Sequence, residues 1–212
     1  MKLTLFLVIV NVAVFAYASQ NLDYFIENYG FSAKSFWEGR YETLITSIFM
    51  HADIPHIGWN MATLFLVGIV LEKYIGRFAY LLVYLISGIA ANLGVLLLAM
   101  VDINILAIGA SAAISGLIGY GAFRLSGKWM VSISFIPIPM PFIIAGALYT
   151  LMNFYGLFIL NTTFSAAAHI IGGVTGGVLG LSGERNKLGK IMLFILAIVI
   201  ISLLPYLIGA LL

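Results

Sequence analysis

The segment Gly109-Ala-Ser-Ala-Ala-Ile-Ser-Gly-Leu-Ile-Gly119 is the most informative part of the sequence, because it places small residues at regular spacing inside a long apolar run. Ser111, Ser115 and Gly119 stand at i, i+4 and i+8, so they share one face of a helix. Small residues on such a face let the backbones of two transmembrane helices approach closely. We therefore predict a membrane-spanning helix between Asp102 and Arg124 that packs tightly against a neighbour through this face.

The rest of the chain is equally apolar. Hydrophobic residues make up 63% of its 212 residues and charged residues only 8%, whereas a soluble domain carries about 25% charged residues. The net charge is only +2 and no long basic run occurs, so nothing points to a nucleic-acid partner. Cysteine is absent from the sequence, which excludes disulfides and thiolate metal sites. The composition predicts an all-α integral membrane protein.

Apolar runs close to the length of a spanning helix, about 20 residues, recur along the chain. The predicted spans are Leu3–Ala18, Ile54–Leu71, Ala79–Val101, Asp102–Arg124, Phe142–Leu160, Ala166–Leu181 and Ile191–Leu211. The first run also resembles a secretory signal peptide, but the apolar character of the rest favours an uncleaved helix. The polar, aromatic-rich stretch Ser19–Thr46 suits a loop at the membrane interface.

The basic residues predict the orientation of these spans. If seven spans alternate in direction, eight of the ten basic residues fall on one side: Lys2, Lys73, Arg77, Arg124, Lys128, Arg185, Lys187 and Lys190. Cytoplasmic loops of membrane proteins are enriched in lysine and arginine. We therefore expect a multi-pass protein of the cell membrane with a cytoplasmic N-terminus.

Three polar side chains are predicted to meet at one depth in the membrane. His56 stands near the start of the second span, Ser111 in the fourth and His169 near the start of the sixth, all toward the outer side. Ionisable groups at membrane depth are costly and therefore mark functional sites. Asn60 shares a helix face with His56. Helix packing alone explains the neighbouring glycines, but it does not explain a serine and a histidine that could act as nucleophile and base.

Three segments carry a more specific pattern: His51-Ala-Asp-Ile-Pro-His56-Ile-Gly-Trp-Asn60, Gly109-Ala-Ser111-Ala-Ala-Ile-Ser-Gly-Leu-Ile-Gly119, and Ala168-His169-Ile-Ile-Gly172-Gly-Val-Thr-Gly176. Their order, spacing and placement on the second, fourth and sixth spans resemble the rhomboid family of intramembrane serine proteases. The resemblance implies a six-helix rhomboid bundle, residues 1–182. We predict that residues 183–212 form a cytoplasmic linker and one additional C-terminal transmembrane helix, peripheral to this core.

The resemblance also implies the chemistry of the site. Ser111 would be the nucleophile and His169 its base, while His56 and Asn60 would stabilise the oxyanion together with the backbone N–H of Ser111. No acidic residue is placed as a third member, so we expect a Ser-His dyad without a cofactor or metal. The partners would be transmembrane protein substrates in the lipid bilayer, and the sequence leaves the oligomeric state open.

Two features depart from the family pattern. Ala112 follows Ser111 where the family usually has glycine, and Glu42-Thr43 stands where a Trp-Arg pair is common. An alanine is acceptable there if the backbone is helical. Ser115 is a competing nucleophile on the same span, but no glycine stands two positions before it. We therefore assign the nucleophile to Ser111.

Three other interpretations stay open. A catalytically inactive rhomboid-like protein that binds transmembrane clients would tolerate both departures, although it leaves Ser111 and His169 without a purpose. A membrane haem protein could use His56 and His169 as axial ligands, but it leaves Ser111 and Asn60 unexplained. A transporter would need an inverted repeat or a substrate-sized set of charges, and neither is evident.

His51 and Glu72 are predicted to have structural roles. His51 stands in the first loop near Asp53, where we expect an interfacial anchor. Glu72 stands near the inner end of the second span, and we expect it to pair helices.

Overall fold

The computed structural model describes residues 1–98, 105–130, 138–159 and 163–209. Its long helices are α1 (Lys2–Ala18), α5 (Ile54–Ile75), α6 (Arg77–Leu98), α7 (Ser111–Arg124), α8 (Phe142–Phe158), α9 (Thr163–Ser182) and α10 (Lys187–Gly209). Short helices α2 (Leu22–Tyr29), α3 (Ala33–Trp37) and α4 (Thr43–Thr46), with 3-10 turns at Ser19–Asn21 and Ser47–Phe49, fold the first loop. The strands are β1 (Phe31–Ser32), β2 (Leu106–Ala107), β3 (Trp129–Met130) and β4 (Met140–Pro141).

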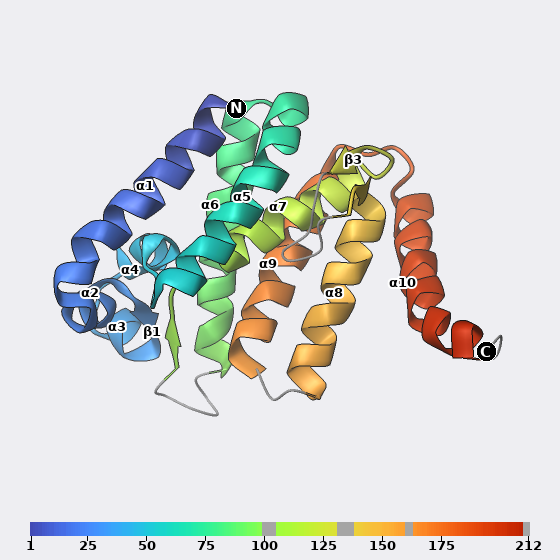
Figure 1. Cartoon of the computed structure of the whole chain (residues 1–212). Helices are drawn as coiled ribbons and strands as arrows, with labels where there is room; N and C mark the ends of the chain where they lie inside the picture. The colour runs from blue at the N-terminus through green and yellow to red at the C-terminus, as the bar shows by residue number, and fades with distance from the viewer. Residues whose placement is uncertain (99–104, 131–137, 160–162, 210–212) are drawn as a thin grey trace.

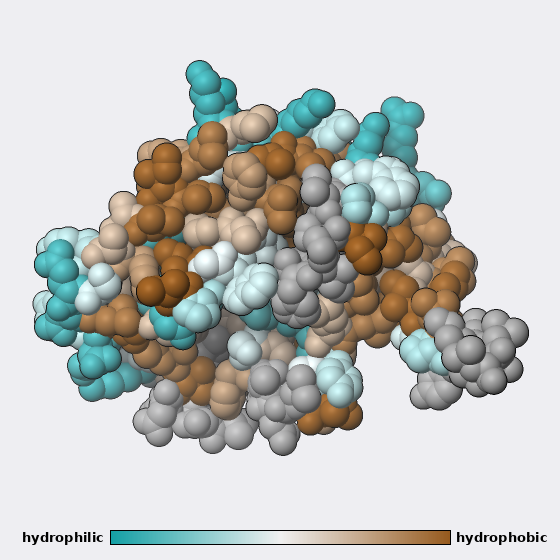
Figure 2. Space-filling model, in the orientation of Figure 1, coloured by the Kyte–Doolittle hydropathy of each residue, from teal (hydrophilic) through white to brown (hydrophobic). Residues whose placement is uncertain are grey.

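The helices form an all-α membrane bundle, as predicted. Among the described residues, five helices are long and apolar enough to cross a membrane: Lys2–Tyr29, Ile54–Ile75, Arg77–Gly94, Phe164–Ser182 and Lys187–Pro205. The helix α8 is apolar but shorter, and α7 has only 14 residues. Apolar side chains cover most of the face seen in Figure 2, and hydrophilic ones gather at its upper edge and lower left. The protein is therefore a multi-pass membrane protein.

The long helices alternate in direction. Figure 1 shows the N-terminus, the α5–α6 turn, strand β3 and the α9–α10 turn at one end of the bundle. The first loop, the end of α8 and the start of α9 lie at the opposite end. The contacts of two lysines support this arrangement. Lys73 and Lys128 come from different connections, and both lie over the ring of Tyr74. The connections that carry eight of the ten basic residues thus share one end of the bundle.

The helix α7 lies in the middle of the bundle and packs most closely against α9 (Figure 1). The glycines of the two helices make this contact possible. A methyl group at Gly119 would overlap the carbonyl of Gly173, and one at Gly176 would overlap the carbonyl of Gly116. The predicted small face is therefore a backbone-to-backbone interface between the fourth and sixth predicted spans.

The helix of the fourth predicted span, which was expected between Asp102 and Arg124, occupies only the second part of that segment. The helix begins at Ser111, and β2 precedes it, paired antiparallel with β1 of the first loop through Phe31 with Ala107 and Ser32 with Leu106. Gly109 has a φ of +107°, which a right-handed helix does not adopt. This turn ends the extended segment and sets the first residue of α7. The predicted boundaries at Val101, Asp102, Leu160 and Leu211 lie outside the described residues.

Two carboxylates fix the ends of α5. At its start, the Asp53 carboxylate accepts the backbone N–H of His56 at 2.6 Å, and Pro55 occupies the first turn, where no backbone donor is needed. Near its end, the buried Glu72 carboxylate accepts the backbone N–H of Thr4 at 2.9 Å and its hydroxyl at 2.8 Å. Glu72 therefore joins α5 to the first turn of α1, in the helix-pairing role expected of it.

The last helix, α10, stands at the edge of the bundle beside α8 (Figure 1). Phe194 packs against Phe123 of α7, with ring centroids 5.0 Å apart. Lys190 forms an ion pair of 2.7 Å with Glu184 and donates to the carbonyl of Phe123 at 2.6 Å. These contacts attach the beginning of α10 to the end of the bundle that carries the N-terminus, while most of its length is exposed.

Candidate active site

The four residues singled out in the sequence lie on one cavity. His56 and Asn60 of α5, Ser111 of α7 and His169 of α9 all line a cavity of about 290 Å³. Tyr149 of α8 lines it as well. Three helices that are distant in the sequence thus bring a serine, two imidazoles and an amide together, and a fourth adds a tyrosine.

Ser111 is the first residue of α7, and Ala110 before it provides no side-chain cap. The first backbone N–H groups of a helix have no partner within the helix and carry the positive end of its dipole. Ser115, one turn later, is fully buried; its hydroxyl donates to the Ser111 carbonyl at 2.7 Å and lies 2.9 Å from the Tyr149 hydroxyl. Ser111 therefore faces the cavity, whereas Ser115 is occupied in holding helices together.

His56 is held so that one ring nitrogen faces the start of α7. The backbone N–H of Ala52 lies 3.4 Å from Nδ1, which must accept this hydrogen bond, so Nε2 carries the proton of the neutral ring. A methyl group on Gly109 would lie 2.7 Å from Nε2 of His56 and 3.4 Å from Nδ2 of Asn60. Two N–H donors thus converge on the backbone just before Ser111.

Asn60 has an unpaired donor. Its side chain is buried, and its Nδ2 has no hydrogen-bond partner in the described part of the chain. A buried amide donor without a partner costs about 1–3 kcal/mol. An unpaired donor at the edge of a cavity is therefore suited to an acceptor oxygen that is not part of the protein.

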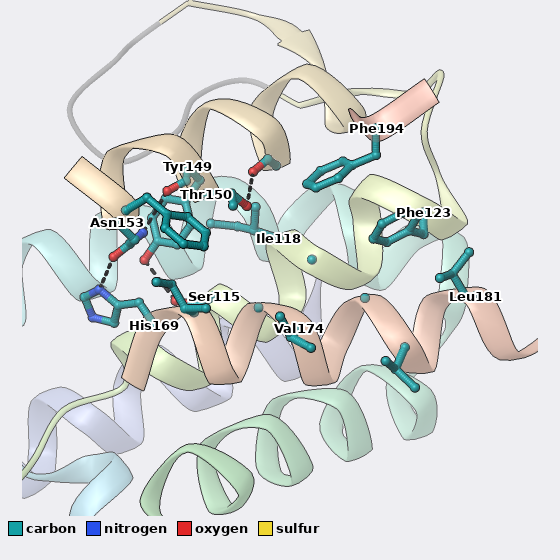
Figure 3. A pocket seen from close by; sticks show the side chains of 17 residues that line it. Ser115, Ile118, Phe123, Tyr149, Thr150, Asn153, His169, Val174, Leu181 and Phe194 are labelled. Atoms are coloured by element: carbon teal, nitrogen blue, oxygen red, sulfur yellow. Dashed lines mark hydrogen bonds between the residues drawn. The ribbon is translucent and has the colours of Figure 1, made fainter. Parts of the chain in front are cut away.

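His169 is oriented by two residues that the sequence analysis missed. Its Nδ1 lies 2.8 Å from Oδ1 of Asn153, and its ring packs against that of Tyr149, with centroids 6.2 Å apart. Figure 3 shows both partners reaching from α8 toward His169. Asn153 is the one amide in the predicted fifth span and stands four residues after Tyr149. That spacing on an apolar helix was the signal that could have found them.

His51 is part of the support for His56. It is fully buried, donates from Nδ1 to the Phe49 carbonyl at 3.3 Å, and meets the His56 ring edge-on with centroids 5.1 Å apart. Burial, and then the neighbouring His56, lower the pKa of His51 from 6.5 to about 4. A neutral His51 therefore packs behind His56, which agrees with the structural role expected of it. In the described residues, no cluster of three or more histidine or acidic side chains could hold a metal ion.

Ala112 fits the observed backbone. It lies in the first turn of α7, where alanine is a favourable helix residue. A methyl group at Gly172 of α9 would overlap its carbonyl, so the close approach at this level depends on the glycine of α9. The departure at Ala112 therefore does not disturb the start of the helix.

Comparison with known proteins identifies the family. The family model described as the Rhomboid domain matches residues 36–186, a stretch that includes every residue of the site. The putative rhomboid protease YdcA of Bacillus subtilis is 38% identical over 87 residues, which are 41% of this chain and 43% of that protein. The rhomboid protease AarA of Providencia stuartii is 26% identical over 238 aligned residues, which cover 97% of this chain and 82% of that protein.

One relative is named as inactive. The Inactive RHOMBOID-like protein 8 of Arabidopsis thaliana is 33% identical over 86 residues, which are 41% of this chain and 24% of that protein. The chain thus spans less than half of YdcA and of this plant protein, but most of AarA. Because the Rhomboid domain covers well over half of the sequence and carries the whole site, the chain belongs to the rhomboid family.

Proposed function

We propose that the protein is an intramembrane serine endopeptidase that hydrolyses peptide bonds in or near the transmembrane segments of other membrane proteins. The observation that carries the proposal is the shared cavity, which Ser111 and His169 line together with two N–H donors, His56 and Asn60. A serine, a base and preorganised donors around one space are the parts that acyl transfer needs. The named proteases among its relatives support the same reaction.

In the acylation step, Nε2 of His169 takes the proton of the Ser111 hydroxyl while Oγ attacks the carbonyl carbon of the scissile peptide. The carbonyl π electrons move to oxygen and form the tetrahedral oxyanion. The imidazolium then gives its proton to the peptide nitrogen, the C–N bond breaks, and the amine leaves. The acyl group stays on Ser111 as an ester.

The oxyanion is stabilised by donors that are already in place. Nε2–H of His56 and Nδ2–H of Asn60 converge beside Gly109, next to the backbone N–H of Ser111 at the positive end of α7. Such donors act without reorganisation at the moment of reaction, and each typically contributes about 2.7–4 kcal/mol. In the deacylation step, water loses a proton to His169 and attacks the ester carbon. The bond between this carbon and Oγ of Ser111 then breaks, Oγ takes the proton back from His169, and the new carboxyl end of the substrate leaves.

The arrangement of the spans also suggests how the protein is oriented in the membrane. The end of the bundle that carries the basic connections would face the cytoplasm of a cell membrane, together with the N-terminus. The site would then open toward the outer half of the bilayer. Substrates would be membrane proteins whose helices reach this depth.

The experiment is labelling of the purified protein with a fluorophosphonate, together with cleavage of a reporter that has one transmembrane helix. Ser111→Ala and His169→Ala should each abolish both signals, and the double variant should be no worse than either, because the two groups act as one unit. Ser182→Ala, which removes an exposed hydroxyl near the inner end of α9, is the matched control and should behave as wild type.

Two outcomes would overturn the proposal. Labelling that depends on Ser115 instead of Ser111 would refute the nucleophile. A folded wild-type protein that is neither labelled nor able to cleave the reporter would favour the alternative, an inactive rhomboid-like protein that binds transmembrane clients. Ala112 and the inactive plant relative are the observations that suggest this alternative.

A further inference from the structure

A chain of hydrogen bonds runs through α8 and connects the helix of Ser111 to His169. The Ser115 hydroxyl donates to the Ser111 carbonyl at 2.7 Å, and the Tyr149 hydroxyl lies 2.9 Å from it. From the same helix, Asn153 donates from Nδ2 to the Tyr149 carbonyl at 2.8 Å and presents Oδ1 to His169 at 2.8 Å. Figure 3 shows the contacts from Tyr149 and Asn153 side by side at one end of the pocket between α8 and α9.

The direction of each bond in this chain is determined by what the groups are able to donate. A carbonyl oxygen only accepts, so the Asn153 atom beside the Tyr149 carbonyl is the NH₂ group, and the atom beside His169 is the oxygen. That oxygen also only accepts, so Nδ1 of His169 must carry a proton. In a neutral imidazole the other nitrogen, Nε2, then has a free lone pair.

We propose that Asn153 is a positioning residue for the reaction: it accepts the Nδ1 proton of His169 and so keeps Nε2 unprotonated and aimed at the cavity. The inference rests on the proposed function, and it adds to the expected dyad a neutral third member from the predicted fifth span. A base whose orienting partner fixes its tautomer is the general logic of nucleophile–base–orienter sites.

Tyr149 completes the orientation. A hydrogen bond to one ring nitrogen still allows the imidazole to tilt about that bond. The Tyr149 ring packs against His169 with an interplanar angle of 40°, which restricts this tilt. Because Tyr149 and Asn153 stand one helical turn apart on α8, both constraints come from a single rigid element.

The two histidines of the cavity are therefore held in opposite tautomers. In His56 the Ala52 N–H points at Nδ1 and makes Nε2 a donor, whereas in His169 the Asn153 oxygen makes Nε2 an acceptor. One imidazole is prepared to stabilise a negative oxygen, and the other to take a proton. The backbone of the first loop and the amide of α8 assign these different roles to chemically identical side chains.

Three variants on α8 test the assignment by the rate of fluorophosphonate labelling and by reporter cleavage across pH. Asn153→Ala removes the acceptor and should lower kcat by about 10- to 100-fold with KM changed less than about threefold, because the base is misaligned but substrate contacts remain. Asn153→Asp keeps an acceptor oxygen of the same size. Thr150→Val is the matched control, since the Thr150 hydroxyl is bound to the Gly146 carbonyl one turn away on the same helix.

The pH profile separates orientation from mere packing. In Asn153→Asp the carboxylate stabilises the protonated, inactive imidazolium, so the acid limb of the profile should move to higher pH by roughly one unit or more, while substantial activity returns above it. Thr150→Val should keep the wild-type profile. An Asn153→Ala variant that cleaves at the wild-type rate, or an Asn153→Asp variant with an unchanged profile, would overturn the proposal.

A measurement on the wild type keeps the test independent of how the variants fold. In protein labelled with ¹⁵N-histidine, the His169 signals should be those of the Nδ1–H tautomer, and a finding of Nε2–H would refute the assignment. Failure of the proposed function looks different: wild type would neither label nor cleave. An active wild type with an Nε2–H tautomer of His169 would reject only the role of Asn153.

Discussion

Gly109 lies directly against the imidazole edge of His56. A methyl group on its Cα would lie 2.7 Å from Nε2 and 2.9 Å from Cε1 of that ring. Carbon atoms in proteins do not approach so closely, so the absence of a side chain at position 109 is what allows His56 to point at the start of α7. The same residue has a φ of +107°, which side-chain-bearing residues rarely adopt.

The first prediction follows from this contact. Gly109→Ala should displace His56, strain the backbone before Ser111, and reduce cleavage by at least about 100-fold, which is the typical cost of losing one oxyanion donor. The comparison is Gly127→Ala, where a methyl group would meet nothing within 4 Å. If Gly109→Ala were as active as Gly127→Ala, His56 would not be held where the reaction takes place.

His56 and Asn60 should act on turnover more than on binding. Both are proposed to contact the oxyanion, which exists only beyond the ground state. His56→Ala and Asn60→Ala should each lower kcat by about 10²–10³-fold and leave KM nearly unchanged. Steady-state cleavage in liposomes measures both constants. A rise in KM at constant kcat would mean that these side chains bind the substrate instead.

Glu72 should contribute to stability and not to chemistry. Its buried carboxylate accepts the backbone N–H groups of Leu3 and Thr4, and Glu72→Gln would place an NH₂ group against these donors. We expect a loss of about 1–3 kcal/mol, seen as a lower unfolding temperature in detergent, with kcat of the folded protein retained. Glu42→Gln, on the exposed surface of the first loop, is the control and should unfold like wild type.

His51 should make the protein less stable in mild acid. Its pKa is lowered from 6.5 to about 4 by burial and by His56, so between these values the unfolded chain binds a proton that the folded chain does not. Stability from this group is therefore complete above pH 6.5 and falls as the pH approaches 4, by at most about 3 kcal/mol. His51→Gln should flatten the dependence of the unfolding temperature on pH. An equally steep dependence in His51→Gln would assign the effect to other groups.

The seventh span should be dispensable for the reaction. Every residue of the proposed site lies on α5, α7, α8 or α9, and α10 contributes only edge contacts such as Phe194 against Phe123. Truncation after Arg185 should preserve cleavage in liposomes and lower the unfolding temperature, by about 2–4 °C for each kcal/mol lost. Phe194→Ala in the full chain isolates the loss of that contact. A truncated protein that is folded but inactive would place α10 in the active assembly.

Features that depend on local sequence were predictable. The start of α5 at Ile54 follows from the Asp53 cap and Pro55, and the small faces of α7 and α9 follow from residues at i and i+4. The same spacing put His56 and Asn60 on one face, and the alternation of spans brought them to the depth of Ser111. These predictions needed only helix periodicity and the length of a membrane span.

Contacts between segments that are distant in the sequence could not be predicted from it. Hydropathy does not distinguish β2 from α7, because both segments are apolar. The residues of β2 are extended because they pair with β1 of the first loop, which is distant in the sequence. Asn153 was overlooked for a similar reason. Its role depends on His169, which meets it only after α8 and α9 have packed.

The short length of α7 has a consequence for the fate of a substrate. Its 14 residues rise about 21 Å, while the hydrocarbon core is about 30 Å thick. If Arg124 marks one boundary of the membrane, Ser111 would lie about 9 Å inside the other, a depth of some six helical residues. A bond cut there divides a spanning helix unequally. Under the proposed function, we expect the six-residue stub to be too short to anchor the domain attached to it, which would be released, while the longer fragment would keep most of its apolar length and stay in the membrane.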